Sequence, residues 1–324
     1  IVMLTSAGVF HWRIQASEAA TEKLAAQYES SVGNDEYPGA RTITDGIKVE
    51  PTIPIPTPDL ALTDLPDVYS FPPGNSDKWE SCVPKPSADQ TFPTTCEFGA
   101  DSAQKTVVLT GGSHVGQWWS AFEEMARDYN WKLILLERSG CQLGLDQDIY
   151  SPHLDIKDTC ITWNKKAVDY IRDEIKPDLV VTLGTSQQFA EPEAVRETQK
   201  AAWKELGDIP LLLLRDNPTF DDQPIECLQQ RANIKNPETY TECTYDRSTF
   251  KYTDTYDQAP RTEHPANSYY VDTSRILSVD DKFPPAIGNV WVWRDKHHIT
   301  DTYAKTTRNF FEQALIDFKP DLLD

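Results

Sequence analysis

The chain has 324 residues, of which 39% are hydrophobic and 10% aromatic, and its formal net charge is -20 at pH 7. This length and composition are typical of a globular protein with a substantial core, and they exclude a mainly disordered or membrane-embedded chain. The acidic excess argues against nucleic acid as a partner and against a polybasic membrane-surface protein, since phosphate binding depends on Lys and Arg.

The N-terminal region is expected to form a linker next to a membrane. Ile1 to Phe10 are apolar, but they are too few to cross a bilayer, which takes about 20 residues. We interpret them either as the flank of a membrane helix in a longer protein or as a buried N-terminal strand. Gln15 to Ser31 combines alanine, glutamate and lysine in a helix-favouring pattern. Residues 1–36 are therefore expected to contain a membrane-proximal linker helix.

A proline-rich stretch follows this linker. Pro51 to Pro58 interleaves proline with Thr and Ile, and Phe71 to Gly74 contains two further prolines. Such runs prevent a regular helix and favour extended chain. Tyrosines, Trp79 and cysteines within the stretch favour packing over the alternative of a flexible spacer. We expect residues 37–104 to be an arm that packs on the following domain.

From Lys105 onward, short apolar runs alternate with longer helical patterns. The apolar runs predict strands buried on both faces, over Val107–Thr110, Leu133–Leu136, Leu179–Leu183, Leu211–Leu214 and Val290–Trp293. The helical patterns predict helices over Val115–Asn130, Thr159–Ile175, Pro192–Leu206 and Thr300–Phe318. The alternation predicts an α/β domain over residues 105–324, with a mostly parallel sheet between two helical layers. Tyr240–Asp280 lacks periodicity and is expected to be an insertion.

The six cysteines occur as three couples close in sequence, with no C-x-x-C ligand pair. The couples are Cys82 with Cys96, Cys141 with Cys160, and Cys227 with Cys243. Although six cysteines allow 15 connectivities, we expect neighbour pairing, because each couple spans a loop-sized stretch. Disulfides would place the chain outside the cytoplasm. Six reduced, buried thiols are the alternative.

Ser113 lies at a predicted strand-to-helix turn. Gly111 and Gly112 precede it, and glycines allow a sharp turn and leave room for a reacting carbonyl. The following helix would direct N–H groups and its positive dipole end toward developing negative charge. Far downstream, Asp295 lies three residues before His298. These two residues are a candidate orienting carboxylate and base for a nucleophilic serine.

Three more positions follow predicted strands: Gly140, Ser186 and Asn217. Because the carboxyl ends of parallel strands share one edge, where active sites of such folds lie, we expect these positions to converge with Ser113. Asn217 has an alternative role as a turn former before Pro218. The six histidines show no zinc-ligand spacing and no Walker-type loop occurs, so no metal or cofactor is expected.

Five short motifs, in this order, resemble one known family. They are Thr110–His114, Trp118, Ser139–Cys141, Arg215–Pro218 and Asp295–Thr300. They resemble the extracytoplasmic SGNH-type domain that is fused to the C-terminus of membrane acyltransferase-3 proteins of actinobacteria. Tyr37–Ala40 and the proline-rich arm resemble the linker that precedes such domains. The resemblance spans Tyr37 to the C-terminus and implies a three-layer α/β/α SGNH-hydrolase-like fold.

The resemblance also implies roles for single residues. Ser113 would be the nucleophile, His298 the general base and acid, and Asp295 its orienting carboxylate. His297 is the neighbouring alternative to His298, although the Ile-Thr that follows matches the family pattern with His298 in the catalytic place. His114, beside the nucleophile, is expected to support the site rather than act as the base.

Two positions depart from the family pattern. Gly112 replaces the aspartate of the common Gly-Asp-Ser motif, and Gly184–Gln187 replaces a Gly-x-Asn-Asp motif whose asparagine serves the oxyanion hole. Losing one such donor can cost about 2.7 to 4 kcal/mol, so a substitute is expected. The candidates are the N–H groups of Ser113 and Gly140, the hydroxyl of Ser186 and the amide of Asn217. A Cys141–Cys160 bond would tether the Gly140 loop to the next helix.

Three side chains near the predicted nucleophile are expected to contact substrate: Trp118, His114 and His297. The face of Trp118 would suit a sugar ring or acyl chain at the rim of the site, but a tryptophan on a helix beside a sheet can equally belong to the core. We expect the neighbouring Trp119 to be a core residue.

The function implied by the resemblance is an O-acyltransferase that forms an acyl-serine, most simply acetyl-serine. The acceptor would be a carbohydrate or glycolipid hydroxyl, such as that of a trehalose mycolate or an envelope polysaccharide. The expected partners are this acceptor, an acetyl donor and a membrane-embedded acyltransferase-3 domain, at the extracytoplasmic face of the membrane. The alternatives are a secreted esterase that uses water and a non-catalytic glycan-binding domain.

Overall fold

The computed structural model describes residues 31, 33–52, 95–100, 102–146, 157–186, 193–220, 243–247 and 263–324. Nearly all of the predicted Gln15–Ser31 helix, and most of the two proline-rich runs, lie outside the described residues. Within the described ranges, no helix combines the length and the apolar character that crossing a membrane would need.

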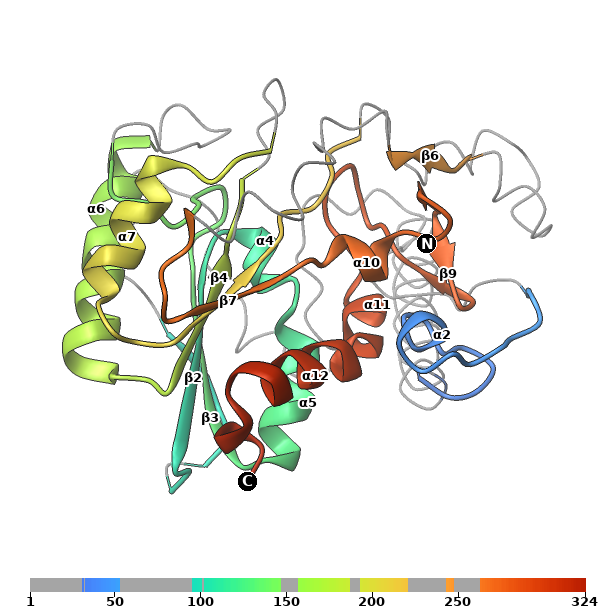
Figure 1. Cartoon of the computed structure of the whole chain (residues 1–324), viewed down its shortest axis with the longest axis horizontal. Coiled ribbons are helices and arrows are strands. Elements are labelled where there is room, and N and C mark those ends of the chain that lie inside the picture. The colour runs from blue at the N-terminus through green and yellow to red at the C-terminus, as the bar shows by residue number, and fades with distance from the viewer. Residues whose placement is uncertain are drawn as a thin grey trace, which may run out of the picture.

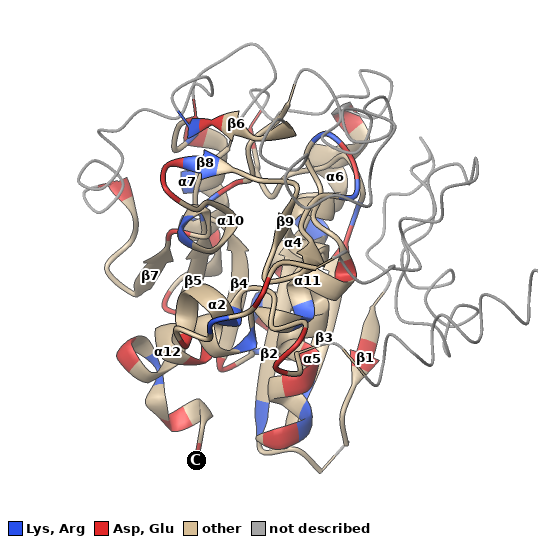
Figure 2. Ribbon diagram, turned by 90° about the vertical axis from the view of Figure 1, so that its right-hand side faces the viewer, with Lys and Arg blue, Asp and Glu red and all other residues tan. Residues whose placement is uncertain are grey.

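A six-stranded sheet forms the centre of the fold (Figure 1). Five of its strands, β2, β3, β4, β5 and β7, run parallel. The sixth strand, β1, pairs antiparallel with β3 at one edge, as Figure 2 also shows. In spatial order the strands are β1 (Cys96–Phe98), β3 (Trp131–Glu137), β2 (Lys105–Gly111), β4 (Leu179–Leu183), β5 (Leu211–Leu214) and β7 (Ser268–Val271).

Alternate residues of β2 pack into two separate cores. Val107 and Leu109 join the core under α5 (Trp119–Asp128) and α12 (Arg308–Phe318), whereas Val108 joins the core under α6 (Lys157–Asp169) and α7 (Glu197–Leu206). Because helices cover both faces of the sheet, its inner strands must be apolar on both sides. The structure thus confirms the expected α/β architecture, with a mostly parallel sheet between helical layers.

Two strand assignments made from the sequence are wrong. Val290–Trp293 does not join the central sheet, because β10 (Val290–Trp291) pairs antiparallel with β9 (Ala286–Ile287) in a separate hairpin. Its apolar character comes from packing in the core next to α11 (Asp301–Thr306). The last parallel strand is instead β7, which lies inside the segment expected to be an insertion. As an edge strand β7 is mostly half-buried, so it lacks the apolar run that marks the inner strands.

The helices follow the predicted order with changed bounds. Val115–Asn130 divides into α4 (Ser113–Gly116) and α5, and Thr300–Phe318 divides into α11 and α12. The break after α4 keeps Ser113 on a short, separate turn. The Thr159–Ile175 region ends in a π-helical turn, and α7 begins only at Glu197. The remaining described elements are short: α2 (Arg41–Thr44), η3 (Tyr170–Ile175), β6 (Tyr245–Asp246), α10 (Ser274–Leu277), β8 (Lys282–Phe283) and η7 (Pro320–Leu322).

Residues 36–52 lie against the β9–β10 hairpin, and Figure 2 shows α2 beside α12. Asn289, at the tip of the hairpin, holds both ends of this segment. Its Nδ2 donates to the carbonyl oxygens of Glu36 (2.9 Å) and Glu50 (3.0 Å), and its Oδ1 accepts the N–H of Thr52 (3.0 Å). The segment is therefore tied to the part of the chain that leads into α11.

Candidate active site

Ser113 is the first residue of α4 and follows the end of β2 by two residues. Gly111 has a φ of 138°, a backbone conformation that residues with side chains rarely adopt. Gly112 is extended and caps α4. The two glycines therefore turn the chain at the carboxyl edge of the sheet, which is where the sequence places the nucleophile.

Asp295, His298 and Ser113 form one hydrogen-bonded chain. Nε2 of His298 lies 2.8 Å from Oγ of Ser113, and Nδ1 of His298 lies 2.7 Å from Oδ2 of Asp295. The other oxygen of Asp295 accepts the backbone N–H groups of His297 (2.9 Å) and His298 (2.8 Å). The structure thus brings together the three side chains that the sequence predicts as a triad.

The electrostatic surroundings keep His298 neutral. Burial lowers the pKa of His298 to about 4, against the opposing effect of Asp295. Burial alone would raise the pKa of Asp295, but His298 outweighs it, and the pKa of this carboxyl lies well below its usual range. An imidazole with its Nδ1–H facing Asp295 presents the lone pair of Nε2 to the Ser113 hydroxyl. This arrangement can take the serine proton and so generate a nucleophile.

A second carboxylate–imidazole chain runs beside the first. Nδ1 of His114 donates to Oδ1 of Asp216 at 2.5 Å, and Nε2 of His114 shares a hydrogen with Nδ1 of His297 across 2.7 Å. The His297 ring lies 4.1 Å, centre to centre, from the His298 ring. Burial lowers the pKa of His114, but Asp216 raises it by more, so the net pKa is above the usual value. Contact of His114 and His297 with substrate stays a prediction.

Asn217 does not have the role of a free oxyanion donor. Its Nδ2 donates to Oε1 of Gln117 (3.0 Å) and to the carbonyl oxygen of His297 (2.9 Å). Oε1 of Gln117 also accepts the N–H of Ile299 (3.0 Å). Both amide hydrogens of Asn217 are thus used to position the loop that carries His298. Sequence reasoning missed Gln117, whose only signal is its place one helical turn after Ser113.

Ser186 is also committed elsewhere. Its hydroxyl donates to Oε1 of Gln142 at 2.5 Å, and its N–H donates to the carbonyl oxygen of Ala194 at 2.9 Å. Nε2 of Gln142 lies 3.4 Å from Oδ2 of Asp216. Gln142, which sequence reasoning also missed, therefore bridges the ends of β4 and β5.

The other two predicted oxyanion donors are the backbone N–H groups of Ser113 and Gly140. Neither donates a hydrogen bond in the part of the chain that the structure describes. Gly140 has a φ of 72° in the turn after β3. Within the described ranges, these two N–H groups are therefore left as candidate oxyanion donors, whereas the two predicted side-chain donors are engaged elsewhere.

Gly112 is required by the close approach of the loop after β3. A Cβ atom on Gly112 would lie 2.9 Å from the carbonyl oxygen of Cys141 and 3.2 Å from its carbonyl carbon. Real Cβ atoms essentially never approach so closely. The aspartate that the family commonly carries here would not fit this backbone, which explains the departure in physical terms.

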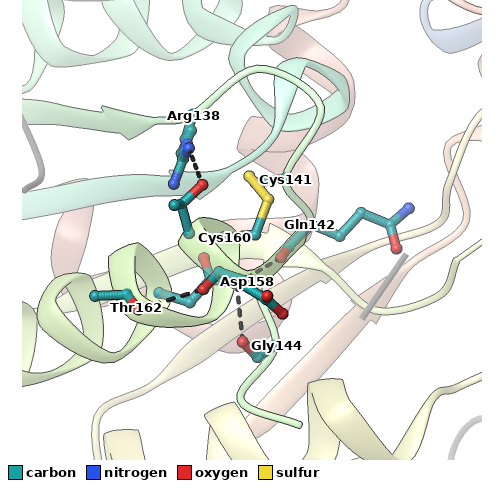
Figure 3. The surroundings of a disulfide bond; sticks show 9 residues. Arg138, Cys141, Gln142, Gly144, Asp158, Cys160 and Thr162 are labelled. Carbon is teal, nitrogen blue, oxygen red and sulfur yellow. Dashed lines mark hydrogen bonds between the residues drawn. A yellow bond between two sulfur atoms is a disulfide. The ribbon is translucent and has the colours of Figure 1, made fainter. Parts of the chain in front are cut away.

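Cys141 and Cys160 form the predicted disulfide, with their Cα atoms 5.6 Å apart (Figure 3). The bond joins the loop after β3 to α6. The side chain of Asn164, on α6, donates to the carbonyl oxygens of Gln142 and Gly144, both at 2.8 Å. The same loop is thus held to α6 by one covalent bond and two hydrogen bonds.

Two further cysteines, Cys96 and Cys243, are also disulfide-bonded. Their predicted partners, Cys82 and Cys227, lie outside the described residues. The pairing of these two couples therefore stays a prediction.

Trp118 is a core residue and not a substrate contact. Its side chain is fully buried, and its ring packs edge-on against Phe311 of α12 at 5.2 Å between centres. The structure thus supports the core alternative that the sequence allowed for Trp118, and not a place at the rim of the site. Trp119 is buried in the same core, as expected.

Arg215, from the Arg215–Pro218 motif, is buried at the end of β5. Its guanidinium group forms ion pairs with Glu193 (3.0 Å), which lies ahead of α7, and with Asp272 (3.1 Å), which directly follows β7. This ion-pair network braces the strand ends from which Asp216 and Asn217 project.

The family model of the SGNH domain (fused to AT3 domains) matches residues 81–313. This chain belongs to that family. A similar solved structure is the periplasmic domain of a lipopolysaccharide acetyltransferase from Salmonella ser. Paratyphi A, with 11% identity and a TM-score of 0.48, covering 67% of this chain and 85% of that chain. No curated protein matches the chain. The family resemblance inferred from the motifs is thereby confirmed.

The first prediction concerns pH. His298 must be neutral to accept a proton, and its pKa is lowered to about 4, so the reactivity of Ser113 in this SGNH domain should rise with pH through about 4. It should be level near pH 6.5. The measurement is the rate of reaction with an activated acetyl ester across pH, with circular dichroism confirming the fold at each point. An acid limb centred near 6.5 would contradict this assignment.

The second prediction concerns Gly112. Gly112→Asp should push the Cys141 backbone away and destabilise the domain by about 1–3 kcal/mol, the usual range for overpacking. Ester reactivity should fall as the Gly140 N–H moves. Urea unfolding and ester kinetics measure the two effects, and Gly112→Ala, which adds only the clashing Cβ, should show the same direction. A Gly112→Asp protein with unchanged stability and rate would show that the loop adapts freely.

The third prediction concerns the disulfide. Replacing Cys141 and Cys160 together by serine should cost roughly 3 kcal/mol of stability and should lower turnover even where the protein is fully folded. Leu315→Ala, in the core on the other side of the sheet, is the control, because it destabilises by a similar amount, about 2–5 kcal/mol, without touching the loop. Equal turnover in the two folded variants would rule out a positioning role for the bond.

Proposed function

We propose that this SGNH domain is an O-acyltransferase that works by double displacement. The observation that carries the proposal is the hydrogen-bonded chain from Asp295 through His298 to Ser113, in a chain whose family is described as fused to AT3 domains. A non-catalytic glycan-binding domain would not need this geometry. The unbroken series of hydrogen bonds from Asp295 to Ser113 therefore favours an enzyme over a binding module.

In the first step Oγ of Ser113 attacks the acyl carbonyl of the donor. Its proton passes to Nε2 of His298, and the carboxylate of Asp295 stabilises the imidazolium. The N–H groups of Ser113 and Gly140 would stabilise the oxyanion. The tetrahedral intermediate collapses to an acyl-serine, and the leaving group takes the proton from His298.

In the second step the acceptor hydroxyl loses its proton to His298 and attacks the acyl-serine. Collapse returns the proton to Ser113 and releases the new ester. Water in place of the acceptor would give hydrolysis, so the esterase differs from the transferase only in which nucleophile reaches the acyl-serine.

The family description supports a membrane-embedded acyltransferase-3 domain as the route by which the acetyl group arrives. A disulfide-bonded chain fits an oxidising compartment, so we place the reaction at the extracytoplasmic face of the membrane. The acceptor that we propose is a carbohydrate or glycolipid hydroxyl of the cell envelope, for which trehalose mycolates and envelope polysaccharides are the candidates.

The experiment is incubation with an activated acetyl ester, with and without sugar acceptors. Transfer that rises with acceptor supports the proposal, plain hydrolysis supports the esterase, and the absence of acyl-enzyme by intact mass spectrometry supports the binding module.

Triad variants give a graded prediction. Ser113→Ala should abolish the acyl-enzyme, because it removes the attacking oxygen. Asp295→Asn should lower the rate by roughly 10⁴-fold, since the amide favours the wrong tautomer of the base. Asp317→Asn, at a carboxylate on α12 that bonds Tyr269 and Gln313, should react as the parent does. If the Ser113→Ala protein gained the same acyl mass as the parent in intact mass spectrometry, Ser113 could not be the nucleophile.

A further inference from the structure

Three imidazoles meet at the site although they are not spaced as metal ligands in the sequence. His114 comes from α4, and His297 and His298 come from the loop before α11. One ring nitrogen from each lies within 4.8 Å of the other two. Among the described residues, no other set of three His, Cys, Asp or Glu side chains gathers in this way.

In two of these imidazoles, Nδ1 faces a carboxylate. Nδ1 of His114 lies 2.5 Å from Asp216, and Nδ1 of His298 lies 2.7 Å from Asp295. Histidines that bind metals almost always donate their other N–H to a carboxylate, a carbonyl or water, which fixes the tautomer and strengthens the ligand. With Nδ1 engaged in this way, Nε2 of His114 faces His297, and Nε2 of His298 faces Oγ of Ser113.

We propose that His114, His297 and His298 bind one divalent transition metal ion of the zinc class, with Oγ of Ser113 next to the fourth ligand position. Three imidazoles and one oxygen match the ligand set of tetrahedral zinc. Oγ of Ser113 lies 2.8 Å from Nε2 of His298, so a metal held by that nitrogen would have this hydroxyl or a water beside it.

Binding requires a small rearrangement. Zn–N distances of about 2.0–2.1 Å separate the nitrogens of a tetrahedral site by about 3.3 Å. The 2.7 Å contact between His114 and His297 must therefore open, and the hydrogen between them must leave. When both rings are neutral, this hydrogen moves to Nε2 of His297. When the His114–His297 pair carries an additional proton, that proton is released to solvent.

The consequence for the reaction is inhibition, and this step rests on the proposed function. The metal takes the lone pair of Nε2 on His298, which otherwise accepts the proton of Ser113. A metal-bound domain would keep its fold but could not generate the nucleophile. Removal of the metal would restore the ability of His298 to accept the proton of Ser113.

The test uses Co²⁺ as a spectroscopic probe on the whole chain. Titration should produce the intense visible absorption of tetrahedral Co²⁺, and Zn²⁺ should displace it. Zn²⁺ should also suppress the ester reaction of Ser113, and EDTA should restore it. Asp216→Asn should weaken Co²⁺ binding by about 10–100-fold, the usual effect of losing such a carboxylate partner.

His297→Gln and His114→Gln remove one ligand each and should lose the tetrahedral spectrum. The control is His264→Gln, since His264 lies apart from the trio, with Nε2 3.0 Å from the carbonyl oxygen of Gly184; it should bind Co²⁺ as the parent does. No tetrahedral spectrum in the parent, or the same Co²⁺ affinity in folded His297→Gln, would overturn the proposal. The spectrum does not depend on turnover, so the metal site and the proposed function fail separately.

Discussion

Two carboxamides hold the loop that carries His298 against the helix that carries Ser113. Oε1 of Gln117 accepts the N–H of Ile299 and a hydrogen of Asn217, whose second amide hydrogen reaches the carbonyl of His297. Loss of either amide would leave buried donors or acceptors unpaired, at a cost of about 1–3 kcal/mol each. The short contact between serine and imidazole thus depends on a polar network and not on apolar packing alone.

The site also sets three imidazoles between two carboxylates, so the charges of these five groups are coupled. A proton on His298 is balanced by Asp295, and one on His114 is balanced by Asp216. His297 lies beside both other rings, 5.0 Å from His114 and 4.1 Å from His298 between centres. Burial together with these two histidine neighbours lowers the pKa of His297 to about 3. A neutral His297 adds no third positive charge beside His114 and His298, whose rings are 5.0 Å apart.

Much of the fold was predictable because its signals are local. The inner strands are uninterrupted apolar runs, and the serine turn is encoded in three consecutive residues. Strand β7 was not predictable, since an edge strand needs no apolar run. The parts played by Gln117 and Gln142 depend on partners distant in sequence, so nothing near them marks their function. Gly112 looked like a lost carboxylate, and only the position of the Cys141 backbone shows that a side chain has no room there.

Asn289 gives the N-terminal segment a mechanical link to the loop that carries His298. Its side chain holds Glu36, Glu50 and Thr52 together. Strand β10 begins at the next residue and ends at Trp291, four residues before Asp295. A pull on the chain ahead of Glu36 must either break these contacts or drag the hairpin with it. Tension applied to the chain ahead of Glu36 would therefore reach the β9–β10 hairpin first, and from there the segment that leads to His298.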